Sequence, residues 1–113
     1  MDISDDGPEL APEWRDAGNN VCGILRGHGV SAVAELFVRA GWRSDSSSWE
    51  GYEVQTRWCR VELDPLDRAE TLLNGVVDPG RLDVLASLLS RFGVGFVLEL
   101  YDESGGLLRE VTG

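Results

Sequence analysis

The stretch that decides the predicted fold is residues 78–101, DPGRLDVLASLLSRFGVGFVLELY. Its first part places leucines three and four positions apart, which is the period of a helix with one buried side. The Asp-Pro pair that opens the stretch is typical of a helix start, and Gly93 is typical of a helix end. Residues 95–101 then alternate in hydrophobicity, which indicates a strand. A helix followed directly by a strand is therefore expected here.

Strand and turn signals continue on both sides of this unit. Downstream, residues 102–106 (DESGG) form a turn and residues 107–111 return, which predicts a hairpin. Upstream, residues 51–63 are rich in Tyr, Val, Thr and Trp and give the longest strand candidate. The alternation changes phase near Trp58, and a β-bulge there would account for the change. A short strand is expected at 42–44.

Two more helices are predicted. Residues 64–74 begin with a second Asp-Pro pair and end at Asn-Gly, so we expect a helix that presents acids on its outer side. Residues 31–40 are apolar around most of the helical circumference, which predicts a buried helix. The fold expected from these elements is α+β: an antiparallel sheet of three to four strands, with about three helices packed mainly on one face.

The predicted domain covers residues 21–113. Residues 1–20 are expected to form an acidic, loosely ordered tail, because Gly and Pro interrupt them and their apolar residues follow no period. The N-terminus lacks the charged and apolar regions of a signal peptide, and no apolar run reaches the roughly 20 residues that span a bilayer. We therefore expect a cytoplasmic protein that does not contact membranes.

The charge of the chain narrows the class of partner. The 113 residues carry 20 acids against 10 arginines and no lysine, for a net charge of −10. Acids concentrate in residues 1–20 and 61–80. Such a chain repels nucleic acid and associates readily with basic proteins. The glycines match neither a P-loop nor a dinucleotide fingerprint, so nucleotide binding is not expected.

Catalytic and metal-binding patterns are missing from the sequence. The single histidine, His28, lies between two glycines, and no serine occupies a nucleophile elbow. Cys22 and Cys59 belong to no paired metal-ligand motif, so we expect them to be small buried hydrophobes. A disulfide between them is the alternative, which depends on their separation in the fold. We therefore expect no enzyme activity, no metal and no cofactor.

The candidate partner-binding residues are an apolar anchor and the acids of the second half of the chain. An exposed aromatic beside acids is typical of an interaction hot spot. The predicted set is Trp49, Glu62, Asp64, Asp67, Glu70 and Asp78.

These features predict a small acidic protein-binding domain. The favoured interpretation is an inhibitor of the immunity or antitoxin type, from a bacterium, that occludes the site of a basic toxin such as a nuclease. It rests on size and charge, since no family motif is present. One alternative is a homodimeric interaction or secretion-chaperone module that pairs through residues 94–100 at a sheet edge. Another is a small-molecule-binding domain or enzyme with His28 and Cys59 beside a pocket.

Overall fold

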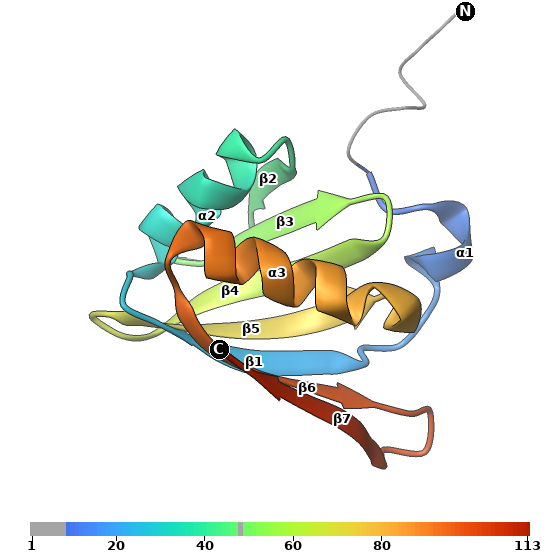
Figure 1. Cartoon of the computed structure of the whole chain (residues 1–113). Coiled ribbons are helices and arrows are strands. Elements are labelled where there is room, and N and C mark those ends of the chain that lie inside the picture. Colours follow the sequence, from blue (N-terminus) through green and yellow to red (C-terminus); the bar gives the residue numbers. More distant parts are fainter. Residues whose placement is uncertain (1–8, 48) are drawn as a thin grey trace, which may run out of the picture.

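The computed structural model describes residues 9–47 and 49–113, which are organised around one antiparallel sheet (Figure 1). The sheet has seven strands in the order β2-β3-β4-β5-β1-β6-β7. The strands are β1 Val21–Arg26, β2 Arg43–Ser46, β3 Tyr52–Thr56, β4 Cys59–Asp67, β5 Glu70–Val77, β6 Gly95–Tyr101 and β7 Leu107–Thr112. The helices are α1 Pro12–Arg15, α2 Val30–Arg39, the 3-10 turn η2 Pro79–Arg81 and α3 Leu82–Phe92.

The expected sheet of three to four strands with about three helices packed mainly on one face is wrong. The described residues form a seven-stranded open sheet with only a few short helices. Three segments account for the extra strands: residues 51–63, residues 64–74 and residues 21–26. The secondary structure of each segment differs from the expected one for its own physical reason.

Residues 51–63 form two strands rather than one. Strands β3 and β4 meet at a tight turn, with Thr56 paired to Cys59 and only Arg57 and Trp58 between them. The chain therefore reverses where the sequence suggested a bulge. A two-residue turn shifts the alternation of side chains as a bulge does, so the phase change had two explanations. Turn residues such as Gly or Asn, which would have identified a hairpin, do not occur there.

The predicted helix at 64–74 is wrong, because these residues form the β4–β5 hairpin. Asp64 pairs with Leu72 and Pro65 pairs with Thr71, with a bulge between Pro65 and Asp67. Thr71 and Leu73 are buried whereas Leu72 is exposed, which is the alternation of a strand. The Asp-Pro pair lies within strand β4 instead of capping a helix. The pairing of β5 with β1 outweighs the helical spacing of the leucines in this segment.

Strand β1 is the third addition, and it lies inside the sheet between β5 and β6. Its buried positions alternate with half-buried ones. Gly23 lies where the neighbouring strand comes very close: a Cβ there would meet the Val97 carbonyl oxygen at 2.3 Å. Glycines on both sides of the segment concealed the strand in the sequence.

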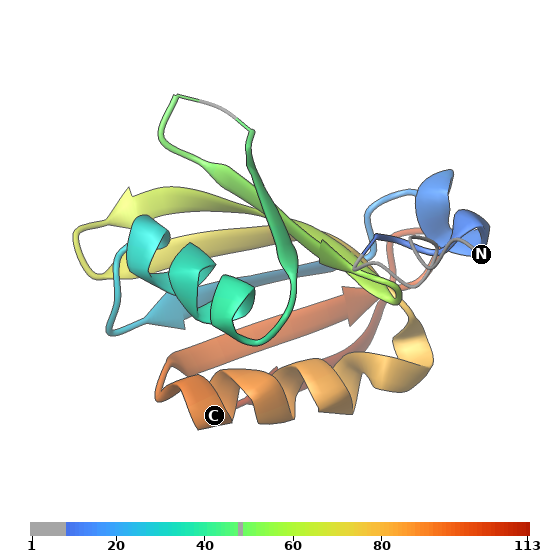
Figure 2. The ribbon, with the colours of Figure 1, turned by 90° about the horizontal axis from the view of Figure 1, so that it is seen from above.

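Helices α2 and α3 lie over the same side of the sheet (Figures 1 and 2). Helix α2 packs against strands β2 to β5 and helix α3 against β6. Gly93 ends α3 with φ of 78°, as expected of a left-handed C-cap. The expectation that residues 31–40 are buried nearly all round is wrong, because α2 buries only Val33, Ala34 and Phe37.

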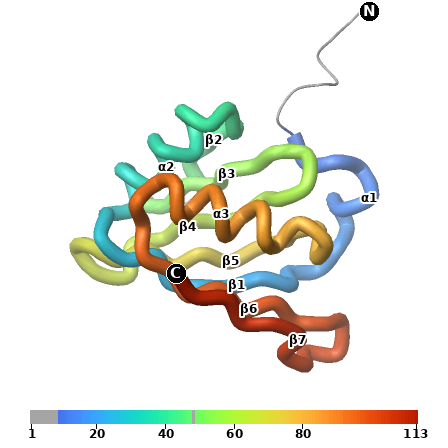
Figure 3. Tube along the Cα trace, in the orientation of Figure 1, coloured from blue at the N-terminus to red at the C-terminus, as the bar shows by residue number. Residues whose placement is uncertain are grey.

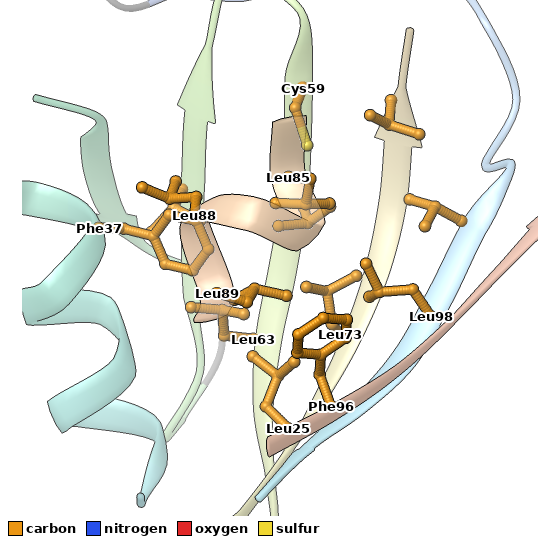
Figure 4. Packing of buried hydrophobic residues seen from close by; sticks show 14 of the residues in the cluster. Leu25, Phe37, Cys59, Leu63, Leu73, Leu85, Leu88, Leu89, Phe96 and Leu98 are labelled. Carbon is orange, nitrogen blue, oxygen red and sulfur yellow. The ribbon is translucent and has the colours of Figure 1, made fainter. Parts of the chain in front are cut away.

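The core lies between these two helices and the sheet. Figure 4 shows Leu85, Leu88 and Leu89 of α3 directed towards side chains from the strands. An aromatic group extends this core: Phe37 lies 4.7 Å from Trp42 and 5.1 Å from Phe92 between ring centroids. Trp58 in turn packs edge-on against Trp42 at 5.4 Å. These rings fix α2 and α3 against the β3–β4 end of the sheet.

The described part of the N-terminal segment is attached to the sheet. Leu10 is 1% exposed; its backbone N–H donates to Gln55 Oε1 at 3.1 Å, and that of Ala11 donates to the Arg57 carbonyl at 2.9 Å. Residues 1–8 of the predicted acidic tail lie outside the described residues.

Replacement of Leu89 by alanine tests the packing of α3. Leu89 is fully buried, so Leu89→Ala is expected to lower the free energy of unfolding by about 2–5 kcal/mol, through lost transfer energy and the cavity left behind. The matched control is Val84→Ala on the same helix, whose side chain is 48% exposed; it should cost less than about 1 kcal/mol. Urea denaturation measures both, and equal losses would contradict this packing.

Candidate protein-binding face

The side of the sheet opposite α2 and α3 has no helix of the described chain lying over its centre (Figures 1 and 2). It is termed the open face. Alternation along each strand directs every second side chain to this side. The residues that define it are Glu53, Arg60, Glu62, Asp64, Asp67, Glu70, Leu72, Asn74, Cys22, Ile24, Arg26, Val97, Glu99 and Glu110.

A row of mostly acidic residues crosses the open face at right angles to the strands. Each member pairs with the next across neighbouring strands: Glu53, Glu62, Asn74, Cys22, Glu99 and Glu110. At both ends of this acidic row, two carboxylates are direct cross-strand neighbours. Like charges in that position destabilise a sheet. The acidic row is thus an arrangement that a cation bound on this face would stabilise.

The Glu99–Glu110 pair is a close one. Phe96 and Gly113 exchange both backbone hydrogen bonds, at 3.1 and 2.9 Å. Three residues further along β6, the register makes Glu99 and Glu110 a pair without hydrogen bonds between them. In antiparallel sheets the Cα atoms of such pairs approach to about 4.5 Å and the side chains lie closest together. Glu99 and Glu110 therefore form a cross-strand pair of the closer kind.

An apolar row runs beside the acidic one. Leu72, Ile24 and Val97 are direct neighbours on strands β5, β1 and β6, and each is partly exposed. Asp64, the partner of Leu72 on β4, ends the row on one side. An apolar centre with a charged surround is the usual anatomy of a protein interface. The sequence does not reveal these residues as a group, because cross-strand neighbours cannot be recognised before the strand order is known.

The structure brings most of the predicted site residues to one region. Glu62, Asp64, Asp67 and Glu70 all belong to the β4–β5 hairpin, where pairing across the hairpin and to β1 sets them on the open face. Glu70 makes an ion pair with Arg26, with 3.5 Å between Oε2 and Nε. Asp67 and Glu70 were expected on the outer side of a helix that Asp64 caps, and Glu62 was expected in the strand before it. They share a face because alternate residues of a strand do.

Trp49 and Asp78 lie at opposite ends of the sheet. Trp49 is 96% exposed, in the turn between β2 and β3, at the same end as the β4–β5 turn. Asp78 follows β5 at the other end, where its Oδ1 accepts from the Gly80 N–H at 3.0 Å. Trp49 therefore lies at the same end of the sheet as the hairpin acids, whereas Asp78 has a capping role at the other end.

Cys22, Glu99 and Tyr101 form a small polar cluster on the open face. The Tyr101 hydroxyl donates to Glu99 Oε1 at 2.7 Å, and the Cys22 thiol donates to the same oxygen at 3.6 Å. The carboxylate raises the pKa of Tyr101 to about 12, and burial adds to the shift. Burial, followed by the hydrogen bond to Glu99, raises the pKa of the Cys22 thiol. Both donors therefore stay protonated at neutral pH.

The other reactive side chains are not assembled into a site. Cys59 is fully buried on the helix-covered side, so it and Cys22 face opposite sides of the sheet and cannot form a disulfide. His28 follows the end of β1, whereas Cys59 lies level with the start of that strand. Within residues 9–47 and 49–113, no group of three or more His, Cys, Asp or Glu could hold a metal ion.

Comparison with protein-family models, curated proteins and solved structures finds no match to this chain. The helices of the described residues are all too short or too polar to cross a membrane.

Neutralising one carboxylate tests the repulsion within the acidic row. Glu110→Gln removes a like charge opposite Glu99, so the free energy of unfolding should rise by about 0.2–1 kcal/mol at low salt. The gain should shrink in 1 M NaCl, because screening already weakens the repulsion there. Glu103→Gln in the β6–β7 turn is the control, and urea denaturation is the measurement. A loss of stability at low salt would contradict the arrangement.

The Cys22 thiol reports on Glu99. Glu99→Gln removes the carboxylate that helps raise the thiol pKa, so more thiolate forms and alkylation by iodoacetamide at pH 8.5 should become about two- to fivefold faster. Cys59 should not react in the folded protein, since it is fully buried. Glu62→Gln, in the same row but beyond Asn74, is the control. An unchanged rate in Glu99→Gln would show that the two side chains do not interact.

Proposed function

We propose that this protein is a protein-binding domain whose acidic open face covers a basic site on another protein. In this proposal it acts by occlusion, as an immunity protein or antitoxin does, and a basic toxin such as a nuclease is the kind of partner that fits. The observation that carries the proposal is the acidic row, in which carboxylates are held beside one another on a sheet face without a covering helix.

The size of the open face suits such a partner. Seven strands spaced at about 4.8 Å give a face about 29 Å wide, and the longer strands extend it by about 20–25 Å. A surface of these dimensions approaches the roughly 800 Å² that each partner contributes to a standard interface. The apolar row would supply the desolvated centre of the contact, and the acids would surround it.

Charge complementarity supplies the proposed mechanism. The net charge of −10 would accelerate encounter with a cationic protein and repel polyanions. A nuclease binds phosphate with a basic cleft, and the carboxylates of the open face would occupy the same cleft. Each Glu–Glu repulsion in the free protein would be relieved when a basic side chain of the partner comes between the two carboxylates.

The two alternative functions lack the features they would need. Strand β6 lies between β1 and β7, so residues 94–100 are not at a sheet edge, where pairing with a second copy would take place. His28 and Cys59 lie apart, and Cys59 reaches no pocket surface. A homo-oligomeric module and a small-molecule site therefore remain predictions without a supporting contact, and a concentration-dependent mass tests the first.

The experiment is a capture at low salt from lysate of the source organism with three baits. The baits are the wild type, the open-face variant E62Q/E99Q/E110Q, and a control E13Q/E35Q/D83N with the same change in net charge away from that face. We expect the wild type and the control to retain one basic protein that the open-face variant loses. Titration of the purified partner should then show binding weakened at least about tenfold in the open-face variant only.

Two results would contradict the proposal. One is retention of the same partner by the open-face variant, which would mean that other surfaces bind it. The other is equal loss from the open-face variant and the control, which would mean that net charge alone drives a non-specific association. Urea denaturation of all three baits guards against misfolding, and the open-face variant should be at least as stable as the wild type.

A further inference from the structure

A groove opens at one end of the sheet, beside the open face. It has a volume of about 560 Å³ and runs between the 14–20 segment, the β6–β7 turn and Leu108 of β7. An adjoining recess of about 290 Å³ shares part of its lining and reaches Cys22 and Asn74 of the acidic row. Figure 3 shows the α1 segment and the β6–β7 turn at the same end of the chain trace. The groove is therefore continuous with the face proposed to bind a partner.

The charge of this groove distinguishes it from the other recesses. Asp16, Asp102 and Glu103 line it, and no Arg, Lys or His of the described chain does. Two other recesses mix both signs: Arg57 and Arg81 line one, and Arg39 lines the other. A positively charged ligand is thus favoured in the groove by every ionised group that lines it.

Two of the lining residues, Asn20 and Asp102, form hydrogen bonds within the protein that hold the groove walls in place. The Asn20 side chain exchanges two hydrogen bonds with the backbone of Val77, each 2.9 Å long. The backbone carbonyl of Asn20 accepts a hydrogen bond from the Tyr101 N–H at 2.8 Å. Asp102 Oδ1 accepts from the Ser104 hydroxyl and the Gly106 N–H at 2.7 and 2.8 Å, and the Ser104 bond lowers the Asp102 pKa most. These contacts fix both walls of the groove.

Two acids and two aromatic rings remain to contact a ligand. Asp16 and Glu103 are exposed and form no ion pair with any arginine of the described residues. Trp14 and Tyr101 are half-buried in the lining, and the Tyr101 hydroxyl is held by Glu99 at 2.7 Å. A cation is attracted both by carboxylates and by the faces of aromatic rings, and this groove is lined by both kinds of side chain.

We propose that this groove binds an arginine side chain of the basic partner that covers the open face. The inference rests on the proposed function, since the partner supplies the arginine. Arginine fits better than lysine because its planar guanidinium stacks on aromatic rings and donates in pairs to carboxylates. Continuity with the acidic row favours a side chain of the docked protein over a free cation, because one surface can then engage both.

The test uses the full chain and the peptide acetyl-Gly-Arg-Gly-amide, with the citrulline peptide as an uncharged control of the same shape. Amide shifts in ¹⁵N-labelled protein are followed by NMR. We expect saturable shifts at Asn19, Tyr101 and Glu103, with a Kd of about 1–10 mM, and none with citrulline. The D16N/E103Q variant should bind at least about threefold more weakly, whereas E35Q/E50Q should match the wild type.

The outcomes separate this inference from the proposed function. Absence of shifts up to 20 mM peptide, or equal shifts with citrulline, would overturn the arginine site. The arginine site would also be overturned if the partner bound the open-face variant more weakly but bound D16N/E103Q as tightly as the wild type. That result would leave the proposed function standing. Arginine-dependent shifts without any captured basic protein would support the groove as a cation site and overturn its assignment to a docked partner.

Discussion

Strand β1 is the element on which the rest of the structure depends, because it alone joins the two parts of the sheet. It pairs along its whole length with β5 on one side and with β6 on the other. Val21 and Leu25 enter the core while Cys22 and Ile24 reach the open face. The close approach of β6 at Gly23 leaves no room for a side chain. The register set here aligns the rows on both faces, so a slip by one residue would exchange them.

The two faces of the sheet contribute to stability in opposite directions. The side under α2 and α3 buries an apolar cluster that supplies the stability of the domain. The other side has no such cover and carries carboxylates opposite one another, an arrangement that costs stability. A fold with a well-packed core can bear that cost, and the acids are then available for a partner. The groove beside α1 extends the same negative surface around the end of the sheet.

The candidate site was partly predictable from the sequence. The acids between Glu62 and Glu70 were recognised from local charge, and they do lie together on the open face, although a hairpin and not a helix gathers them. Trp49 could be identified from its acidic, glycine-flanked neighbourhood, and it is the most exposed large hydrophobic residue of the described chain. Asp78 was grouped with these acids by proximity in the sequence alone, and the length of β5 separates it from them.

The sequence by itself determined the elements whose signals are local: helix α3 with its glycine stop, the β6–β7 hairpin and the excess of acid. Helical periodicity, turn residues and net charge need no knowledge of distant contacts. Only the tertiary structure decided the place of β1 between β5 and β6, the β4–β5 hairpin and the rows on the open face. Glu62 and Glu99 are far apart in the chain, and they fall into one row because backbone hydrogen bonds between strands set the register. Cross-strand neighbours are fixed by that pairing, which no local pattern records.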